Sequence, residues 1–299
     1  MAKRYLGILG IIFVIILVSC VKNMDEAYIP SYIKIDKIDI ATSGDQGSSS
    51  SNISDAWIYV NGADQGAYQL PAIIPLLSEG INTIKVAPGI KMNGVSTTRV
   101  PYPLVEPVEI EVNLIKDSIQ LLNVECKYYE TSKFAEVESF ESNNVNFETV
   151  TNISSEWRRT NSDDPEGYVF DGNNSGVGIL DTDTSKLVIV TKKYFEELPK
   201  NGLPVFVELN FKSNTTITVG LQSYTLAADG TTLLGGTSDF MYLNPSEEWK
   251  KIYINFTTRL SYDVNVPVYR FTFTAAGKNG DEPGVVLIDN FKVVYRDIN

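Results

Sequence analysis

The sequence predicts an all-β protein built from two β-sandwich domains. Short apolar-polar alternations recur along the chain, and in residues 108–114 every second residue is apolar, the pattern of a strand with one buried face. Such runs are separated by turn residues such as Asn61-Gly62, which accept positive φ and favour a hairpin. In the second half of the chain, only residues 194–198 offer even a helical turn. A length of 299 residues fits two domains of ordinary size.

The chain opens with the features of a bacterial lipoprotein signal. A positive start at Lys3-Arg4 precedes an apolar stretch, and Leu17-Val18-Ser19-Cys20 reads as a lipobox, which is cut before a cysteine that becomes lipidated. We expect residues 1–19 to be removed, Cys20 to carry lipid and residues 20–27 to form a polar tether. The apolar stretch is shorter than the roughly 20 residues that span a bilayer. An uncleaved anchor helix and an ordinary secretory signal are the alternatives.

The composition excludes several functional classes. The chain has no histidine, which rules out Ser-His-Asp and Cys-His nucleophile systems and zinc sites that need imidazole. Its 37 acidic and 25 basic residues give a formal charge of −12, the opposite of the balance in a nucleic-acid-binding protein. If Cys20 is lipidated, Cys126 has no disulfide partner, and its apolar neighbours predict that it is buried.

We place the first domain at residues 28–116. Isoleucines alternate with charged residues from Ile33 to Ile40, with a slip of register near Lys37. Further strands are expected at residues 56–60, 67–70, 82–86 and 108–114. Residues 117–133 are predicted to link the domains.

The second domain is placed at residues 134–299. Alternating runs, one of them at residues 205–212, are separated by turns and predict a sandwich or barrel. The domain resembles the jelly rolls of carbohydrate-binding modules and galactose-binding-like domains. The matching residues are Glu138-Ser139-Phe140-Glu141, the approach from Ser246 to Ile252, and Ile288-Asp289-Asn290-Phe291.

The first half carries resemblances of its own. Residues 57–94 resemble a PEGA-type surface domain, a small β-sandwich of bacterial envelope proteins, through Tyr59-Val60-Asn61-Gly62, Gly66, Leu70-Pro71 and Gly80 with residues 82–86. The opening at residues 29–36 looks like a Bacteroidota lipoprotein family associated with outer-membrane machinery. Lys22 with Asp25-Glu26 resembles the signal that exports such lipoproteins to the cell surface. Asp117-Ser118-Ile119 resembles a short O-glycosylation sequon, which makes Ser118 a candidate acceptor.

The jelly-roll resemblance also implies a metal site. In such domains, acidic residues of the first and last strands often hold a structural calcium ion, and Glu138, Glu141 and Asp289 are the matching positions. Calcium takes six to eight oxygen ligands. The alternative is that these carboxylates face water or cap turns. No other cofactor is predicted.

Exposed aromatic residues beside polar groups would be needed to bind a glycan. The candidates are Trp157, Tyr168, Tyr224 and Tyr242. Packing in the core or at its rim is the alternative for each of them. For Trp249, which precedes a strand, packing at the sandwich edge is the stronger interpretation.

Together these features predict a non-catalytic lipoprotein of the outer membrane, held there through Cys20 and facing outward. The leading hypothesis is an accessory or structural subunit of an outer-membrane protein assembly or export machine, with an outer-membrane protein as its partner. The alternative is a surface lipoprotein that binds glycans. A glycosidase comes third, because no acid and nucleophile pair can be named.

Overall fold

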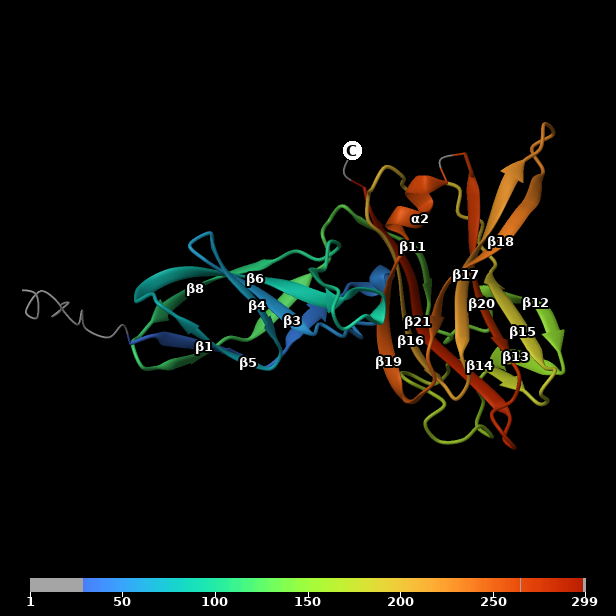
Figure 1. The fold of residues 1–299 in the computed structure, drawn as a ribbon, viewed down its shortest axis with the longest axis horizontal. Helices are drawn as coiled ribbons and strands as arrows, with labels where there is room; N and C mark the ends of the chain where they lie inside the picture. Colours follow the sequence, from blue (N-terminus) through green and yellow to red (C-terminus); the bar gives the residue numbers. More distant parts are fainter. Residues whose placement is uncertain (1–28, 264, 298–299) are drawn as a thin grey trace, which may run out of the picture.

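The computed structural model describes residues 29–263 and 265–297, and their strands form two units arranged end to end (Figure 1). The predicted all-β class is confirmed. Within these residues helix is confined to α2 (Thr257–Tyr262) and two 3₁₀ turns, η1 (Gly44–Gln46) and η2 (Met92–Gly94). None of the helices described is long and apolar enough to cross a membrane. The predicted signal, Cys20 and the tether lie outside the described residues.

The N-terminal unit is a sandwich of short sheets. Strands β5-β1-β9 and β10-β2 lie on one side, and β4-β3-β6-β7, with β8 paired to β6, form the other. The predicted slip near Lys37 is confirmed, because the chain leaves the first strand after Ile35 and enters the second at Ile38. The strands are β1 (Ser31–Ile35), β2 (Ile38–Ala41), β3 (Asp55–Val60), β4 (Ala63–Gln69), β5 (Ala72–Leu76), β6 (Gly80–Lys91), β7 (Arg99–Pro101), β8 (Val108–Leu114), β9 (Ile119–Leu121) and β10 (Val124–Lys127).

The predicted linker at residues 117–133 is wrong. This stretch contains β9 and β10, which run parallel to β1 and β2, and the first residues of the following strand. Alternate residues point into the core of the N-terminal unit: Leu122, Val124, Cys126 and Tyr128 are all buried. Strands of three and four residues are too short for a clear alternation, so the stretch reads as a connection.

The C-terminal unit is a jelly roll, as predicted. Strands β14-β21-β16-β19 form one sheet and β15-β20-β17-β18 the other, which is the strand order of an eight-stranded jelly roll. The strands are β11 (Ser132–Glu138), β12 (Phe147–Ile153), β13 (Ser155–Arg159), β14 (Gly176–Leu180), β15 (Lys186–Thr191), β16 (Val205–Ser213), β17 (Ile217–Leu226), β18 (Thr232–Leu243), β19 (Ser246–Asn255), β20 (Val268–Ala276) and β21 (Gly284–Arg296).

Three further strands widen the two sheets of the jelly roll. β13 extends one sheet beside β14, β12 extends the other beside β15, and β11 pairs with the end of β21. We call the sheet that contains β14, β16, β19 and β21 the domain-facing sheet, because the N-terminal unit packs on it. The sheet β12-β15-β20-β17-β18 is called the distal sheet, since it lies on the far side of the molecule (Figure 1).

The two units share a core. Phe206, Tyr253 and Val294 of the domain-facing sheet belong to the hydrophobic cluster of the N-terminal unit. Beside them, the fully buried Glu208 accepts hydrogen bonds from the hydroxyls of Tyr102 (2.6 Å) and Tyr128 (2.7 Å). Residues far apart in the chain are therefore fixed against one another by apolar and polar contacts together.

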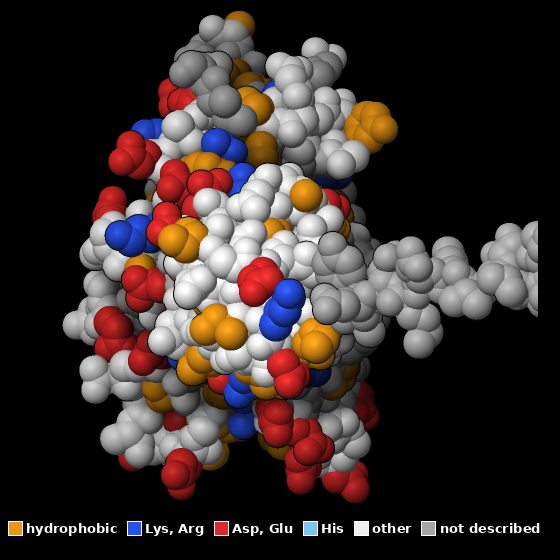
Figure 2. Space-filling model, turned by 90° about the vertical axis from the view of Figure 1, so that its left-hand side faces the viewer, with side chains coloured by type: hydrophobic (Ala, Val, Ile, Leu, Met, Phe, Trp, Pro, Cys, Tyr) orange, Lys and Arg blue, Asp and Glu red, His pale blue; other side chains and the backbone are white. Residues whose placement is uncertain are grey.

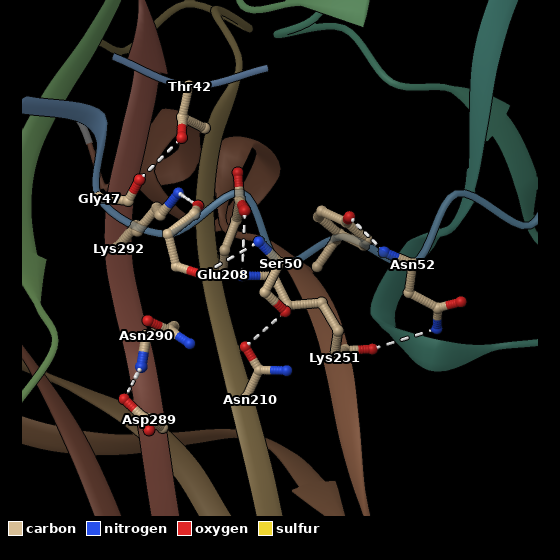
Figure 3. Close-up of polar contacts among 12 residues, drawn as sticks. Thr42, Gly47, Ser50, Asn52, Glu208, Asn210, Lys251, Asp289, Asn290 and Lys292 are labelled. Carbon is tan, nitrogen blue, oxygen red and sulfur yellow. Dashed lines mark hydrogen bonds and ion pairs between the residues drawn. The ribbon is translucent and has the colours of Figure 1, made fainter. Parts of the chain in front are cut away.

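The charges at this joint are paired within the protein. Lys251 Nζ lies 3.3 Å from Glu208 Oε2, and Lys292 is fully buried on the neighbouring strand (Figure 3). Burial raises the pKa of Glu208, but the lysines and the tyrosine hydroxyls outweigh this and lower it overall. Glu208 is therefore ionised in the folded protein. We call Glu208, Lys251, Lys292, Tyr102 and Tyr128 the joint cluster.

Candidate functional site

The outer face of the domain-facing sheet is closed by other segments of the chain. Beyond the joint, residues 42–54 cross it: Lys292 Nζ donates to Ser48 O (2.6 Å), and Ser50 Oγ donates to Asn210 Oδ1 (3.0 Å) (Figure 3). At the other end, Trp249 Nε1 donates to Gly167 O (3.0 Å). Trp249 therefore packs under a loop at the sandwich edge. Of the two outer sheet faces of the jelly roll, that of the distal sheet is therefore the candidate binding face.

Strand register identifies which residues share the outer face of the distal sheet. Tyr224, Gln222, Gly220 and Thr218 of β17 alternate with core residues, and their partners on β20 share the face with them. On β18, Tyr242 pairs with Thr218 and stands on the same side. Polar and aromatic residues occupy most of these positions. They are Glu148, Arg270, Thr272, Thr274, Thr218, Gln222, Tyr224 and Tyr242.

Arg270 is the organising residue of this face. Its Nε donates to Thr191 O (2.5 Å) and its Nη2 to Glu148 Oε1 (2.5 Å). Strand β15 lies between the strands of these two charged residues. The ion pair therefore spans β15, where Val190 pairs with Glu148 and is fully buried although it points away from the core. The guanidinium is held in one position.

Two tyrosines lie against this arginine. The Tyr194 ring lies 4.8 Å from the Arg270 guanidinium carbon, close enough for a cation-π contact. The Tyr194 and Tyr224 rings meet edge to face at 5.0 Å. Tyr224 also donates from its hydroxyl to Gln222 Oε1 (2.6 Å). We call Tyr194, Tyr224, Arg270, Glu148 and Gln222 the tyrosine–arginine cluster.

Arg270 keeps its charge and Tyr224 keeps its hydroxyl proton at neutral pH. Burial lowers the pKa of Arg270, but its contacts with Glu148 and Tyr224 outweigh this and raise it above the ordinary value. Burial is also the main cause that raises the pKa of Tyr224. The site therefore offers a fixed cation, a protonated phenol and a ring, Tyr194, that is 41% exposed.

A pocket adjoins the cluster. It has a volume of about 250 Å³ and is open to solvent on the other side of Tyr194. It lies between the segment that follows β15 and the ends of β11 and β21. Its lining residues are Ala135, Lys193, Tyr194, Phe195, Glu196, Glu197, Leu198 and Tyr295. Tyr194 thus belongs to both the pocket and the sheet face.

The structure divides the four predicted ligand-binding aromatics. Tyr224 and Tyr242 lie on the distal face, and Tyr242 is 64% exposed. Trp157 instead packs against the core, edge to face with Phe140 and Phe147. Tyr168 lies in the loop that covers the domain-facing sheet. Trp157 and Tyr168 therefore contribute nothing to the distal face, because their strand and loop belong to the other sheet.

Sequence reasoning missed Tyr194, Arg270 and Glu148. Tyr194 follows β15 in a short connection, and the other two lie on strands more than one hundred residues apart. The alternation of β20 places Arg270 opposite the core residues, which marks it as outward-facing. Nothing in the sequence shows that Glu148 would come beside it.

The three predicted calcium ligands do not form one site. Glu138 accepts hydrogen bonds from two backbone N–H groups, and Glu141 accepts from the backbone N–H groups of Asn173 and Asn174. Asp289 accepts from the Ser175 hydroxyl and from the backbone N–H of Asn290. Among the residues that the structure describes, no group of three or more acidic or cysteine side chains could hold a metal ion. Each carboxylate is thus occupied by local hydrogen bonds, and that of Glu141 holds the turn at Asn173 and Asn174.

The remaining candidates concern modification. Cys126 is fully buried and unpaired, as predicted, and burial raises the pKa of its thiol to about 11. Ser118 lies in the turn before β9, where its hydroxyl accepts a hydrogen bond from Gln120 Nε2 (3.3 Å). Its glycosylation stays a prediction.

No protein-family model and no curated protein matches the chain. Similar solved structures include a family 11 carbohydrate-binding module from Clostridium thermocellum, at 14% identity and TM-score 0.36, covering 54% of this chain and 93% of that one. Another is a carbohydrate-binding module of the β-sandwich superfamily, at 11% identity and TM-score 0.35, covering 81% and 85%.

A third similar structure is a bacteriophage CBA120 tailspike domain, at 10% identity and TM-score 0.39, covering 58% of this chain. The present chain spans only 26% of that tailspike chain, and 29% of a C. thermocellum xylanase structure that also resembles it. At such low identities and TM-scores, these similarities decide nothing about a ligand. The strand order described above is what identifies the jelly roll.

Proposed function

We propose that this protein is a non-catalytic glycan-binding protein and that carbohydrate lies across the outer face of the distal sheet. The observation that carries the proposal is the tyrosine–arginine cluster, in which an exposed ring is fixed beside a buried, charged guanidinium. The accessory-subunit hypothesis has no comparable observation among the described residues.

The chemistry of the cluster suits a sugar. A pyranose ring has apolar C–H faces and a rim of hydroxyls, so it needs an aromatic surface beside groups that donate and accept hydrogen bonds. Tyr194 supplies the surface, the half-exposed Glu148 accepts, and the buried Arg270 holds both in place. Because the arginine is already held by Thr191 and Glu148, little side-chain ordering is required when a ligand binds.

The length of the face suits a chain of sugars. Tyr242 pairs with Thr218, six residues along β17 from Tyr224, which corresponds to roughly 20 Å of strand. Hydroxyl side chains of threonine line β20 between these two ends. Tyr224 itself is buried, but Tyr194 lies against it and is 41% exposed. A linear oligosaccharide could contact Tyr194 and Tyr242 at once, whereas a monosaccharide could not.

Native affinity electrophoresis tests the proposal. The protein is run in gels that contain xylan, β-1,4-galactan or mixed-linkage glucan, and a binding polysaccharide is then titrated by calorimetry. We expect retardation by at least one polymer, and about tenfold or more weaker binding for Tyr194→Ala, as for an interface anchor. Tyr242→Ala should weaken a long ligand more than a short one.

Tyr262→Ala is the matched control. Tyr262 is 81% exposed on α2 and lies off the distal face, so its removal should leave the affinity unchanged. Equal affinities for Tyr194→Ala, Tyr242→Ala and wild type would contradict a site on this face. A failure of all three polymers and of a broad glycan array would reject glycan binding itself.

Attachment to an outer membrane through Cys20, with the protein facing outward, is the second part of the proposal. It is supported by the lipobox in the sequence. Intact-mass measurement on protein extracted from membranes tests it directly. A mass that includes residues 20–299 and acyl chains is expected, and an unmodified Cys20 would reject it.

A further inference from the structure

Large aliphatic side chains gather at one end of the N-terminal unit. Ile29, Leu77, Ile81, Ile115 and Ile119 are between 51% and 72% exposed. We call these five residues the apolar tip. Soluble domains rarely collect exposed apolar residues in this way without a partner.

The strand register brings the tip residues together. β1 begins beside the end of β5, since Ser31 pairs with Leu76, and β6 begins beside the end of β8, since Gly80 pairs with Leu114. The loops that carry Leu77 and Ile115 are tied by an ion pair between Glu79 and Lys116 (3.0 Å). The tip is thus one surface, formed by several loops and strand ends.

The tip is also where the chain enters the folded unit. Ile29 is its first described residue, and Asp117 N donates to Pro30 O (3.0 Å) beside it. Only eight residues separate Ile29 from Cys20, a reach of about 28 Å at full extension. An anchor at Cys20, or an uncleaved apolar segment before it, would hold this end of the protein close to a bilayer.

The chemistry of the tip favours lipid as the occupant. Its five side chains are isoleucine or leucine, whereas the residues enriched at the centres of protein interfaces are tyrosine, tryptophan and arginine. Glu79 and Lys116 form an ion pair beside the tip, and Asp117 adds one acidic side chain next to it. Figure 2 looks onto this end and shows separate hydrophobic side chains around one acidic and one basic side chain, with further acidic side chains toward the margins.

We infer that the apolar tip rests in the interfacial layer of the membrane to which the chain is anchored. The inference depends on the anchor and is independent of glycan binding. The tip side chains insert between lipid headgroups, and the two units project away from the bilayer. The surface that contacts lipid is distinct from the distal face.

A fluorescent probe at the tip tests this inference. Leu77→Cys, 69% exposed, is labelled with a nitrobenzoxadiazole maleimide, and the buried Cys126 does not compete for the label. The lipidated protein is placed in phosphatidylcholine and phosphatidylglycerol liposomes with nitroxide-labelled lipid. We expect the probe to shift to the blue and to lose more than half of its emission to the nitroxide.

Leu233→Cys is the matched control, because Leu233 is 54% exposed on the β17–β18 hairpin at the distal side. Its emission should be unaffected by the nitroxide. Equal emission changes at the two positions would overturn the inference. A blue shift at Leu77 that grows with protein concentration and ignores the nitroxide would overturn it too, and would point to a second copy of the chain. Absence of any membrane anchor by intact mass would remove its basis.

Discussion

The joint cluster makes a quantitative prediction about stability. Glu208→Gln keeps the size of the side chain and a hydrogen-bond acceptor for the hydroxyls of Tyr102 and Tyr128, but it removes the only carboxylate of the joint cluster. Lys251 and Lys292, whose side chains are 3% and 0% exposed, would then be buried without a carboxylate partner in the cluster. Breaking a buried ion pair from one side costs about 3–5 kcal/mol, so we expect a loss of that size.

Urea unfolding followed by circular dichroism and intrinsic fluorescence measures this loss. Because the tyrosines and the lysines belong to different units, the substitution should also weaken their coupling and split the transition into two steps. Adding Lys251→Met to Glu208→Gln should recover part of the loss, since one unpaired charge is gone. Glu79→Gln is the control, because the exposed pair with Lys116 is worth only about 0–1 kcal/mol. If Glu208→Gln costs no more than Glu79→Gln, the joint cluster does not hold the units together.

Four further predictions concern single sites. Burial raises the pKa of Asp289 to about 6, so the folded protein keeps a proton that the unfolded chain loses near pH 4. The free energy of unfolding should therefore fall as pH rises from about 4 to 6. In urea titrations, Asp289→Asn should abolish that fall. Burial lowers the pKa of Lys292 to about 8, so stability should rise between about pH 8 and 10, where the unfolded lysine still binds its proton, and Lys292→Met should remove the rise. A Cβ on Gly176 would lie 2.5 Å from Trp157 and 2.6 Å from Phe140, while one on Gly236 meets nothing within 4 Å; thermal unfolding should show a cost of about 1–3 kcal/mol for Gly176→Ala only. The Cys126 thiol should react with Ellman's reagent at pH 8 only after denaturation, and fast labelling of the native protein would contradict its burial.

Much of the fold could be predicted because most strands have a recognisable pattern in their own local sequence. The alternation in β8 and the slip between β1 and β2 follow from the period of a half-buried strand, and both are in the structure. The failure at β9 and β10 has a physical reason as well. Parallel strands of three or four residues gain their pairing from β1 and β2, about 85 residues earlier, and such long-range pairing leaves little trace in the local sequence.

The candidate site was predictable only in part for a related reason. An aromatic residue is equally suited to a core and to a binding face, so Trp157 and Tyr224 cannot be told apart without the sheet to which each belongs. Arg270 has no neighbour in the sequence that indicates its role. Its partners come from β12 and from the segment after β15, and only the completed sheet places Glu148 and Tyr194 around it.

The joint cluster fixes how the two proposed surfaces, the apolar tip and the distal face, are oriented relative to each other. A buried ion pair is a weak source of stability compared with apolar packing, but it can fix one arrangement, because any other would leave its charges unpaired. In this protein it fixes the orientation of the N-terminal unit on the domain-facing sheet, so the apolar tip and the distal sheet stand at opposite ends of the molecule (Figure 1). An anchored protein with a flexible joint could lay the distal face against the membrane. If the chain is anchored as proposed, a locked joint would point the tyrosine–arginine cluster away from the bilayer, toward polysaccharide outside it. Loosening the joint with Glu208→Gln should therefore reduce polysaccharide capture by anchored protein on liposomes more than binding by the same protein in detergent solution.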